Sequence, residues 1–132
     1  MTAPMTSLQS ERLWGRIEAL SKFTRPDAPW TRRAFSPLFV EARAWLKQQM
    51  CDAGLVVHQD AGGNLIGRRE GSGSGLAPII TGSHCDTVVG GGRFDGIIGV
   101  LAGIEIAHAL QDAGVVMRHP LEVIDFLSDE PS

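Results

Sequence analysis

Residues 77–96, APIITGSHCDTVVGGGRFDG, decide how this chain folds. The segment APIITG is short and apolar, as expected of a central strand that is buried on both faces of a sheet. The remainder is rich in glycine, which allows the backbone to turn sharply. Residues 97–113 then place apolar side chains at helical spacing, and Gly114 is suited to end that helix. The stretch therefore predicts a strand, a glycine-rich loop and the start of a helix.

The segments around this stretch complete an α/β pattern. Residues 121–127, LEVIDFL, are typical of a further strand, so strand, helix and strand form a βαβ unit with a parallel pair. Residues 55–58 and 64–68 favour two strands of a hairpin, with the turn between them. We therefore predict an α/β fold class with a partly parallel sheet and flanking helices.

Two helices are expected before the hairpin. Ser10 can cap the first, because apolar residues follow it at helical spacing. Ser36 followed by Pro37 marks the start of the second helix, since serine is a favoured N-cap and proline is favoured at the first helical position. Gly54 suits the left-handed position that ends it.

Composition and charge limit the classes of function. The 132 residues make one domain, and 12 basic against 15 acidic residues do not favour nucleic acid or an anionic membrane as a partner. Arg25, Arg32 and Arg33 lie near prolines, and we expect them in a solvated loop. No apolar run approaches the ~20 residues that span a bilayer, and the N-terminal segment lacks the pattern of a signal peptide. Cys51 and Cys85 form no disulfide framework, so a cytoplasmic location is expected.

A histidine and several acids are predicted at one edge of the sheet. His84 and Asp86 end one strand, while Asp129 and Glu130 follow the next strand along the chain. Asp95 lies at the start of the intervening helix. Functional groups of open α/β sheets gather beyond the carboxyl ends of the strands, so we expect these side chains to converge.

Metal binding explains this set better than the rival chemistries do. The sequence has no GxxxxGK[ST] phosphate loop, and Leu76 and Asp95 stand where the last glycine of a GxGxxG motif would be. No GxSxG nucleophile motif is present either. Imidazole together with carboxylates is a typical donor set for zinc.

Each residue also has a simpler explanation. His84 could be structural, Asp95 could cap the helix, and Asp129 with Glu130 could form a polar chain end. Adjacent acids repel each other unless a cation lies between them or one is protonated. The combination therefore favours a metal site, with Asp86 as the hydrogen-bonding partner of the His84 imidazole. We expect Cys85 to be a core residue and not a ligand.

Four stretches of this chain resemble a known family: TRRAFSP (31–37), AGGNLIGR (61–68), TGSHCDTVVGGGRFDGIIGVLAG (81–103) and LEVIDFLSDEPS (121–132). The family is that of the zinc-dependent amidohydrolases that include N-carbamoyl-L-amino acid hydrolase, allantoate amidohydrolase and β-ureidopropionase. It belongs to the wider aminoacylase and carboxypeptidase-like dizinc clan.

The resemblance implies a site with two divalent metal ions, zinc first, with manganese or cobalt as alternatives. His84 would bind one ion, Asp95 would bridge both, and Glu130 would bind the other, while Asp86 supports His84. Asp129 stands where the family has its general base, normally glutamate. The implied reaction is hydrolysis of the ureido or amide group of N-carbamoyl amino acids or allantoate-like small molecules by a metal-activated water.

The family members are about three times as long as this chain. Residues 1–132 are therefore expected to be the N-terminal portion of the catalytic domain, with the lid and dimerisation domain and the C-terminal part absent. Full-length members are expected to be homodimeric. The fragment alone is expected to be inactive, and its last strand, 121–127, to lack flanking partners. The alternatives are a dizinc aminoacylase or peptidase, and a non-catalytic truncated remnant.

Overall fold

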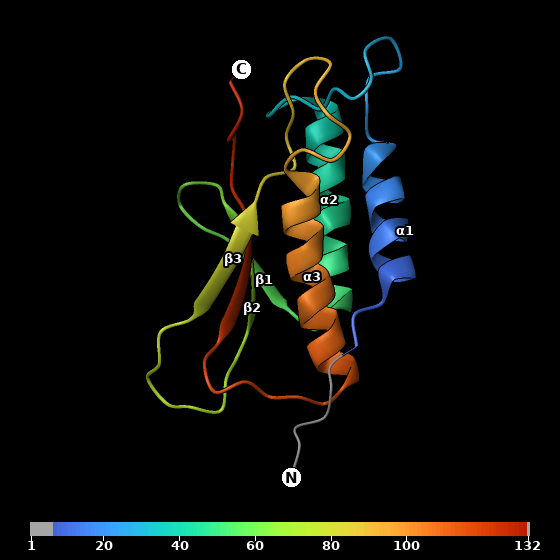
Figure 1. Cartoon of the computed structure of the whole chain (residues 1–132). Coiled ribbons are helices and arrows are strands. Elements are labelled where there is room, and N and C mark those ends of the chain that lie inside the picture. The colour runs from blue at the N-terminus through green and yellow to red at the C-terminus, as the bar shows by residue number, and fades with distance from the viewer. Residues whose placement is uncertain (1–6, 132) are drawn as a thin grey trace.

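The computed structural model describes residues 7–131 and shows an α/β arrangement (Figure 1). Residues 1–6 of the N-terminal segment, and Ser132 at the end of the 121–132 stretch, lie outside the described residues. The elements in chain order are α1 (Ser10–Ser21), α2 (Pro37–Asp52), β1 (Val56–Gln59), β2 (Leu65–Arg69), β3 (Ile79–Ser83), α3 (Ile97–Asp112) and β4 (Leu121–Asp125). None of the described helices combines the length and the apolar character that crossing a membrane requires.

The helix ends follow local sequence signals in α2 but not in α1. The Ser36 hydroxyl accepts a hydrogen bond from the Phe39 amide at 3.2 Å, and Gly54 after the helix has a φ of 82°. Both predictions for α2 are confirmed. Ser10, however, is not the cap of α1: it is already helical, and the preceding Gln9 amide donates to the Glu105 carboxylate at 2.8 Å. An acid from α3 therefore replaces the local cap.

The sheet is mixed, with the strand order β1-β2-β4-β3. β1 and β2 form the predicted antiparallel hairpin, and β3 and β4 form the predicted parallel pair on either side of α3. The helices lie on one side of this sheet, as Figure 1 shows. α2 contacts β1 and β2, α3 contacts β3 and β4, and α1 packs on the other two helices. The βαβ prediction is therefore confirmed.

Two predictions about strand position are wrong. β3 is an edge strand and not a central one, and Ile79 and Ile80 are 48% and 56% exposed. The last strand does have partners, because β4 pairs with β2 on one side and with β3 on the other. The cause is the antiparallel pairing of β2 with β4, which places β4 inside the sheet and leaves β3 outermost. With helices on one side only, the face that carries Ile80 stays open.

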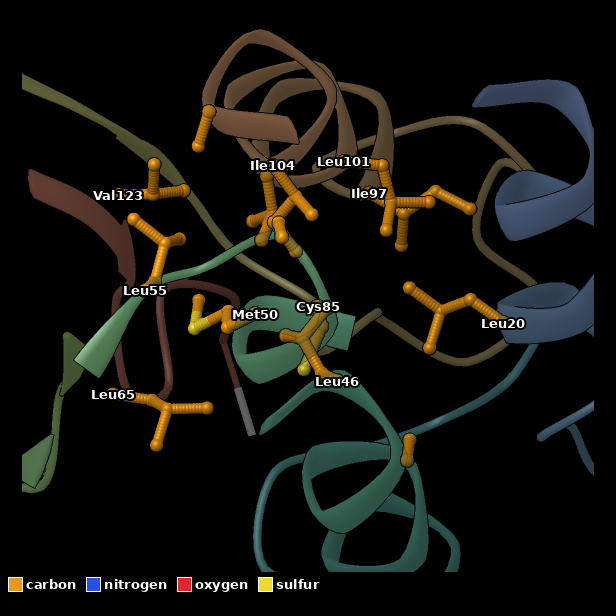
Figure 2. Close-up of a cluster of buried hydrophobic side chains, with 14 of the residues drawn as sticks. Leu20, Leu46, Met50, Leu55, Leu65, Cys85, Ile97, Leu101, Ile104 and Val123 are labelled. Atoms are coloured by element: carbon orange, nitrogen blue, oxygen red, sulfur yellow. The ribbon is translucent and has the colours of Figure 1, made fainter. Parts of the chain in front are cut away.

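The core lies between the helices and the covered face of the sheet. Figure 2 shows side chains from all three helices and from the sheet pointing into one interior. Leu20 of α1, Leu46 of α2 and Leu101 of α3 are fully buried there. Cys85, two residues after the end of β3, is fully buried in the same cluster. Its prediction as a core residue is confirmed.

Gly99 lets α3 approach the end of β3 closely, and its replacement by alanine is expected to destabilise the fold. An added Cβ at Gly99 would lie 2.5 Å from the Ser83 Cβ, so a backbone shift is required. We expect a loss of about 1 kcal/mol or more in the free energy of unfolding, measured by urea denaturation. Gly15 in α1 is the matched control, because a Cβ there meets no atom within 4 Å. Gly15→Ala is expected to stabilise the fold by about 0.5–1 kcal/mol. Equal effects of the two changes would contradict the close approach.

Candidate metal centre

The parallel pair β3 and β4 directs two chain segments to the same end of the sheet (Figure 1). His84 follows directly after β3, and the loop from His84 leads into α3 at that end. After β4, Ser128 adopts a left-handed φ of 52°, and Asp129 and Glu130 follow this turn. The carboxyl-end rule therefore predicted correctly where these segments meet.

The three predicted metal ligands lie together. His84, Asp95 and Glu130 each offer one ligand atom, and these atoms all lie within 4.8 Å of one another. Asp95 does not cap the helix: Gly96 is the N-cap of α3, and no side chain forms a cap hydrogen bond. Gly96 has a φ of 73°, and a Cβ there would lie 2.5 Å from the His84 ring. The glycine thus lets the imidazole lie against the start of α3 beside Asp95.

The hydrogen bonds of His84 define its tautomer. Its Nδ1 lies 2.9 Å from the main-chain oxygen of Asp86, and a carbonyl oxygen can only accept, so Nδ1 carries the hydrogen. In the neutral ring, Nε2 then keeps a lone pair. Nε2 faces Asp129 Oδ2 at 3.6 Å and Glu130 Oε1 at 3.8 Å. A lone pair that faces two carboxylates is favourable only if a proton or a cation lies among them.

Asp86 joins the two segments of the site. Its side chain is 1% exposed, and its Oδ2 accepts a hydrogen bond from the Glu130 amide at 3.1 Å. The other oxygen, Oδ1, lies 3.4 Å from His84 Nδ1 and is a buried atom without a hydrogen bond. The main-chain carbonyl of Asp86 therefore orients His84. Its carboxylate, which was predicted to bond the imidazole, instead accepts from the Glu130 amide and holds that residue in place.

The acids of the site favour a bound positive charge. A hydrogen bond with the Asp95 carboxyl group, followed by partial desolvation, raises the pKa of Glu130 above its ordinary value. Two neighbouring carboxyl groups repel each other when both are ionised, so a positive charge between them is favoured. A divalent metal would supply that charge, and one imidazole with two carboxylates suits zinc, manganese or cobalt. The residues present fit a divalent metal ion.

The other histidines lie elsewhere. His58 is exposed in β1. His119 donates through Nδ1 to the Ala77 carbonyl at 2.8 Å, so that nitrogen carries a hydrogen. His108 in α3 lies beside Arg16, with 2.8 Å between its Nδ1 and the guanidinium. These three histidines are therefore surface or structural residues that lie apart from the candidate metal ligands.

Three polar residues beneath the site were not identified from the sequence. Arg32 is only 3% exposed, so the prediction of a solvated loop is wrong at this position. Burial of its guanidinium is tolerated because main-chain carbonyls accept its hydrogen bonds, including Cys85 O at 2.7 Å and Phe23 O at 2.8 Å. Asp125, at the end of β4, is fully buried and forms an ion pair with Arg43 of α2 at 2.8 Å.

No family model matches the chain, but individual proteins do. It is 45% identical over 127 residues to an N-carbamoyl-L-amino-acid amidohydrolase of Pseudomonas sp. (strain NS671), covering 96% of this chain. It is 39% identical to a ureidoglycolate hydrolase of Oryza sativa subsp. japonica, covering 95% of this chain and 26% of the relative. A solved hydantoinase/carbamoylase family amidase from Burkholderia ambifaria superposes with a TM-score of 0.90 at 38% identity, over 96% of this chain and 31% of that one. Over nearly its whole length, the chain is therefore related to about a third of these carbamoylase-type amidohydrolases.

The family members are considerably longer than this chain. The chain spans 30% and 31% of the length of two curated N-carbamoyl-amino-acid amidohydrolases that it matches. The likeness therefore extends over nearly all of this chain and over about a third of each relative. The remaining two thirds of each relative have no counterpart among the 132 residues.

Proposed function

We propose that this chain is the N-terminal portion of the catalytic domain of a metal-dependent amidohydrolase. Its substrates would be small molecules with a ureido or amide group, such as N-carbamoyl amino acids or allantoate-like compounds. The names of the relatives support this substrate class. The observation that carries the proposal is the arrangement at His84: Nδ1 is occupied by a carbonyl, and Nε2 faces carboxylates within 4 Å.

His84, Asp95 and Glu130 would hold divalent metal ions, with zinc as the first choice and manganese or cobalt as alternatives. When bound, such ions acidify a water molecule and polarise the carbonyl group that is attacked. His84 can act as a ligand without losing its orientation, because the hydrogen bond at Nδ1 leaves Nε2 free. A second ion would need further ligands from outside these 132 residues.

Asp129 would move the proton in the reaction. Its side chain is 56% exposed, and Oδ2 lies 3.6 Å from His84 Nε2, so it is beside the proposed ligands and still accessible to water. The carboxylate would accept a proton from the attacking water and donate it to the leaving nitrogen. Asp86 would take no proton and would keep His84 and Glu130 in place.

The setting that we propose is a reducing, cytoplasmic one, since Cys51 and Cys85 are both free. The dimeric state expected for full-length family members remains a prediction. Small-molecule substrates need no nucleic acid or membrane partner.

The proposal is tested by completing the chain. We would join residues 1–131 to the remaining two thirds of the Pseudomonas relative in one polypeptide and assay a panel of N-carbamoyl-L-amino acids, allantoate and N-acetyl amino acids. We expect ammonia release from a ureido substrate that is lost on chelation and restored by zinc, manganese or cobalt. The same polypeptide with His84→Ala should be inactive. The chain alone should also be inactive, because three ligands cannot hold two metal ions.

Each rival predicts a different result in this assay. Preferential hydrolysis of N-acetyl amino acids would favour an aminoacylase or peptidase. A well-folded, inactive chimaera would favour a non-catalytic remnant. Metal-dependent hydrolysis by the 132-residue chain itself would contradict the expectation that the fragment is incompetent.

A further inference from the structure

The peptide groups of Cys85, between His84 and Asp86, are held from both sides by charged side chains. The Cys85 N–H donates to Asp125 Oδ1 at 2.8 Å, and the Cys85 carbonyl accepts from Arg32 Nε at 2.7 Å. Cys85 and Asp125 are fully buried, and Arg32 is 3% exposed. A carboxylate and a guanidinium therefore fix one residue of the main chain inside the core.

Each of these two side chains also forms hydrogen bonds with a helix or with the residues that follow one. Arg43 of α2 donates through Nε to Asp125 Oδ2 at 2.8 Å and through Nη2 to the Asp125 carbonyl at 2.9 Å. Arg32 donates to the Phe23 carbonyl at 2.8 Å, just beyond the end of α1. The main chain of Arg32 also pairs with Thr87, through bonds of 2.8 and 2.9 Å. The end of β3 is thus tied to α1 and α2 as well as to β4.

Charged side chains are not needed merely to satisfy the main-chain N–H and carbonyl groups at the end of a strand. Burying an ionised side chain is costly, and a well-packed apolar side chain is often as stable as a buried ion pair. Within residues 7–131, Arg32 forms no salt bridge and directs its charge to carbonyl oxygens. Two buried charged side chains at the main chain of one residue are expected where the orientation of the neighbouring side chains matters. Here the neighbouring side chains are those of His84 and Asp86.

We propose that Arg32 and Asp125 are positioning residues of the metal centre. By fixing the N–H and the carbonyl of Cys85, they set the direction in which His84 and Asp86 leave the main chain. This inference rests on the proposed metal site at His84, Asp95 and Glu130. It gives a role to the TRRAFSP stretch, since Arg32 holds the strand end on which the histidine lies.

The test uses the metal-free 132-residue chain and Co²⁺ as the probe. Titration calorimetry would give the Co²⁺ affinity of wild type, Asp125→Ala, Asp125→Asn and Arg32→Met, after circular dichroism has verified the fold of each. We expect Asp125→Ala and Arg32→Met to bind Co²⁺ about 10–100-fold more weakly, as is usual when a partner of a ligand is removed. Asp125→Asn should lose less, because its amide oxygen can still accept from the Cys85 N–H. If Arg32→Met does not fold, the two Asp125 variants carry the test.

The control variants remove the same charges elsewhere. Asp112→Asn alters an acid that is paired with Arg12, and Arg68→Met alters an arginine that is paired with Glu70. Both should bind Co²⁺ as wild type does. Unchanged affinity in Asp125→Ala and Arg32→Met would overturn the inference.

A second readout separates this inference from the metal site itself. Amide exchange at Cys85, followed by nuclear magnetic resonance without metal, should be at least about tenfold faster in Asp125→Ala than in wild type, because one charged hydrogen bond is lost. If wild type bound no Co²⁺, the proposed metal site would fail. Equal exchange rates would independently refute the role of Asp125.

Discussion

Replacing Glu105 with alanine is expected to lower the free energy of unfolding by about 3 kcal/mol, the lower end of the range for breaking a buried ion pair. Glu105 of α3 is 1% exposed and accepts hydrogen bonds from Arg12 Nε and Nη2, each at 2.8 Å. It also accepts from the Gln9 amide at 2.8 Å, and Arg16 Nη1 lies 3.4 Å away. Without Glu105, the largely buried Arg16 loses the carboxylate that balances its charge, and α1 loses its cap.

The loss is measured by urea denaturation at pH 7, with Glu18→Ala as the control on the exposed side of α1. The control should change the free energy of unfolding by less than about 0.5 kcal/mol. An unchanged midpoint in Glu105→Ala would mean that the ion cluster does not hold α1 on α3.

The pH dependence of the same effect identifies the charge as its cause. Burial on its own would raise the pKa of Glu105, but the hydrogen bonds from Arg12 and from the Gln9 amide outweigh it, and the pKa lies below its ordinary value. An acid with a lowered pKa stabilises the fold above its unfolded pKa of about 4.3 and loses this contribution as the pH falls through the folded pKa. The stability difference between wild type and Glu105→Gln should therefore shrink as the pH falls from 7 toward 3.

Local signals predicted the elements of this fold, and long-range pairing determined their arrangement. Ser36 and Gly54 predicted the ends of α2 correctly, because both act through bonds within a few residues. The cap of α1 was missed since it comes from Glu105, far along the chain. The edge position of β3 was missed for the same reason. An apolar run such as APIITG fits a central or an edge strand, and only the pairing of β2 with β4 decides between them.

The site was predictable where topology alone brings residues together. His84 and Glu130 follow parallel strands, so their approach follows from the βαβ unit. Arg32 was missed because a charged residue near prolines usually lies in solvent, and no periodic pattern indicates bonds to distant carbonyls. Asp125 did carry a signal: strand alternation places it on the same face as Leu121 and Val123, which are core residues, while Glu122 points the other way. An acid on the core face of a strand needs a buried partner.

Asp129→Glu in the completed polypeptide is expected to raise kcat by up to ~10²-fold. The Asp129 carboxylate is one methylene shorter than the glutamate that the family resemblance implies at this position, which reduces its reach by about 1.5 Å. Its Oδ2 lies 3.6 Å from His84 Nε2, and its side chain is 56% exposed, so a longer side chain has room. Steady-state kinetics with an N-carbamoyl-L-amino acid would measure the change. KM should change little, because a general base acts on the water in the transition state and contributes little to substrate binding.

Asp129→Asn is the matched control, because it keeps the size of the side chain and removes its ability to accept a proton. Its kcat should fall well below that of the Asp129 parent, while its metal content stays the same, since the proposed ligands His84, Asp95 and Glu130 are unaltered. The order glutamate above aspartate above asparagine would identify position 129 as the proton acceptor whose reach limits the rate. Equal rates for all three variants would exclude Asp129 as the base, and the proton would then have to be taken by another group.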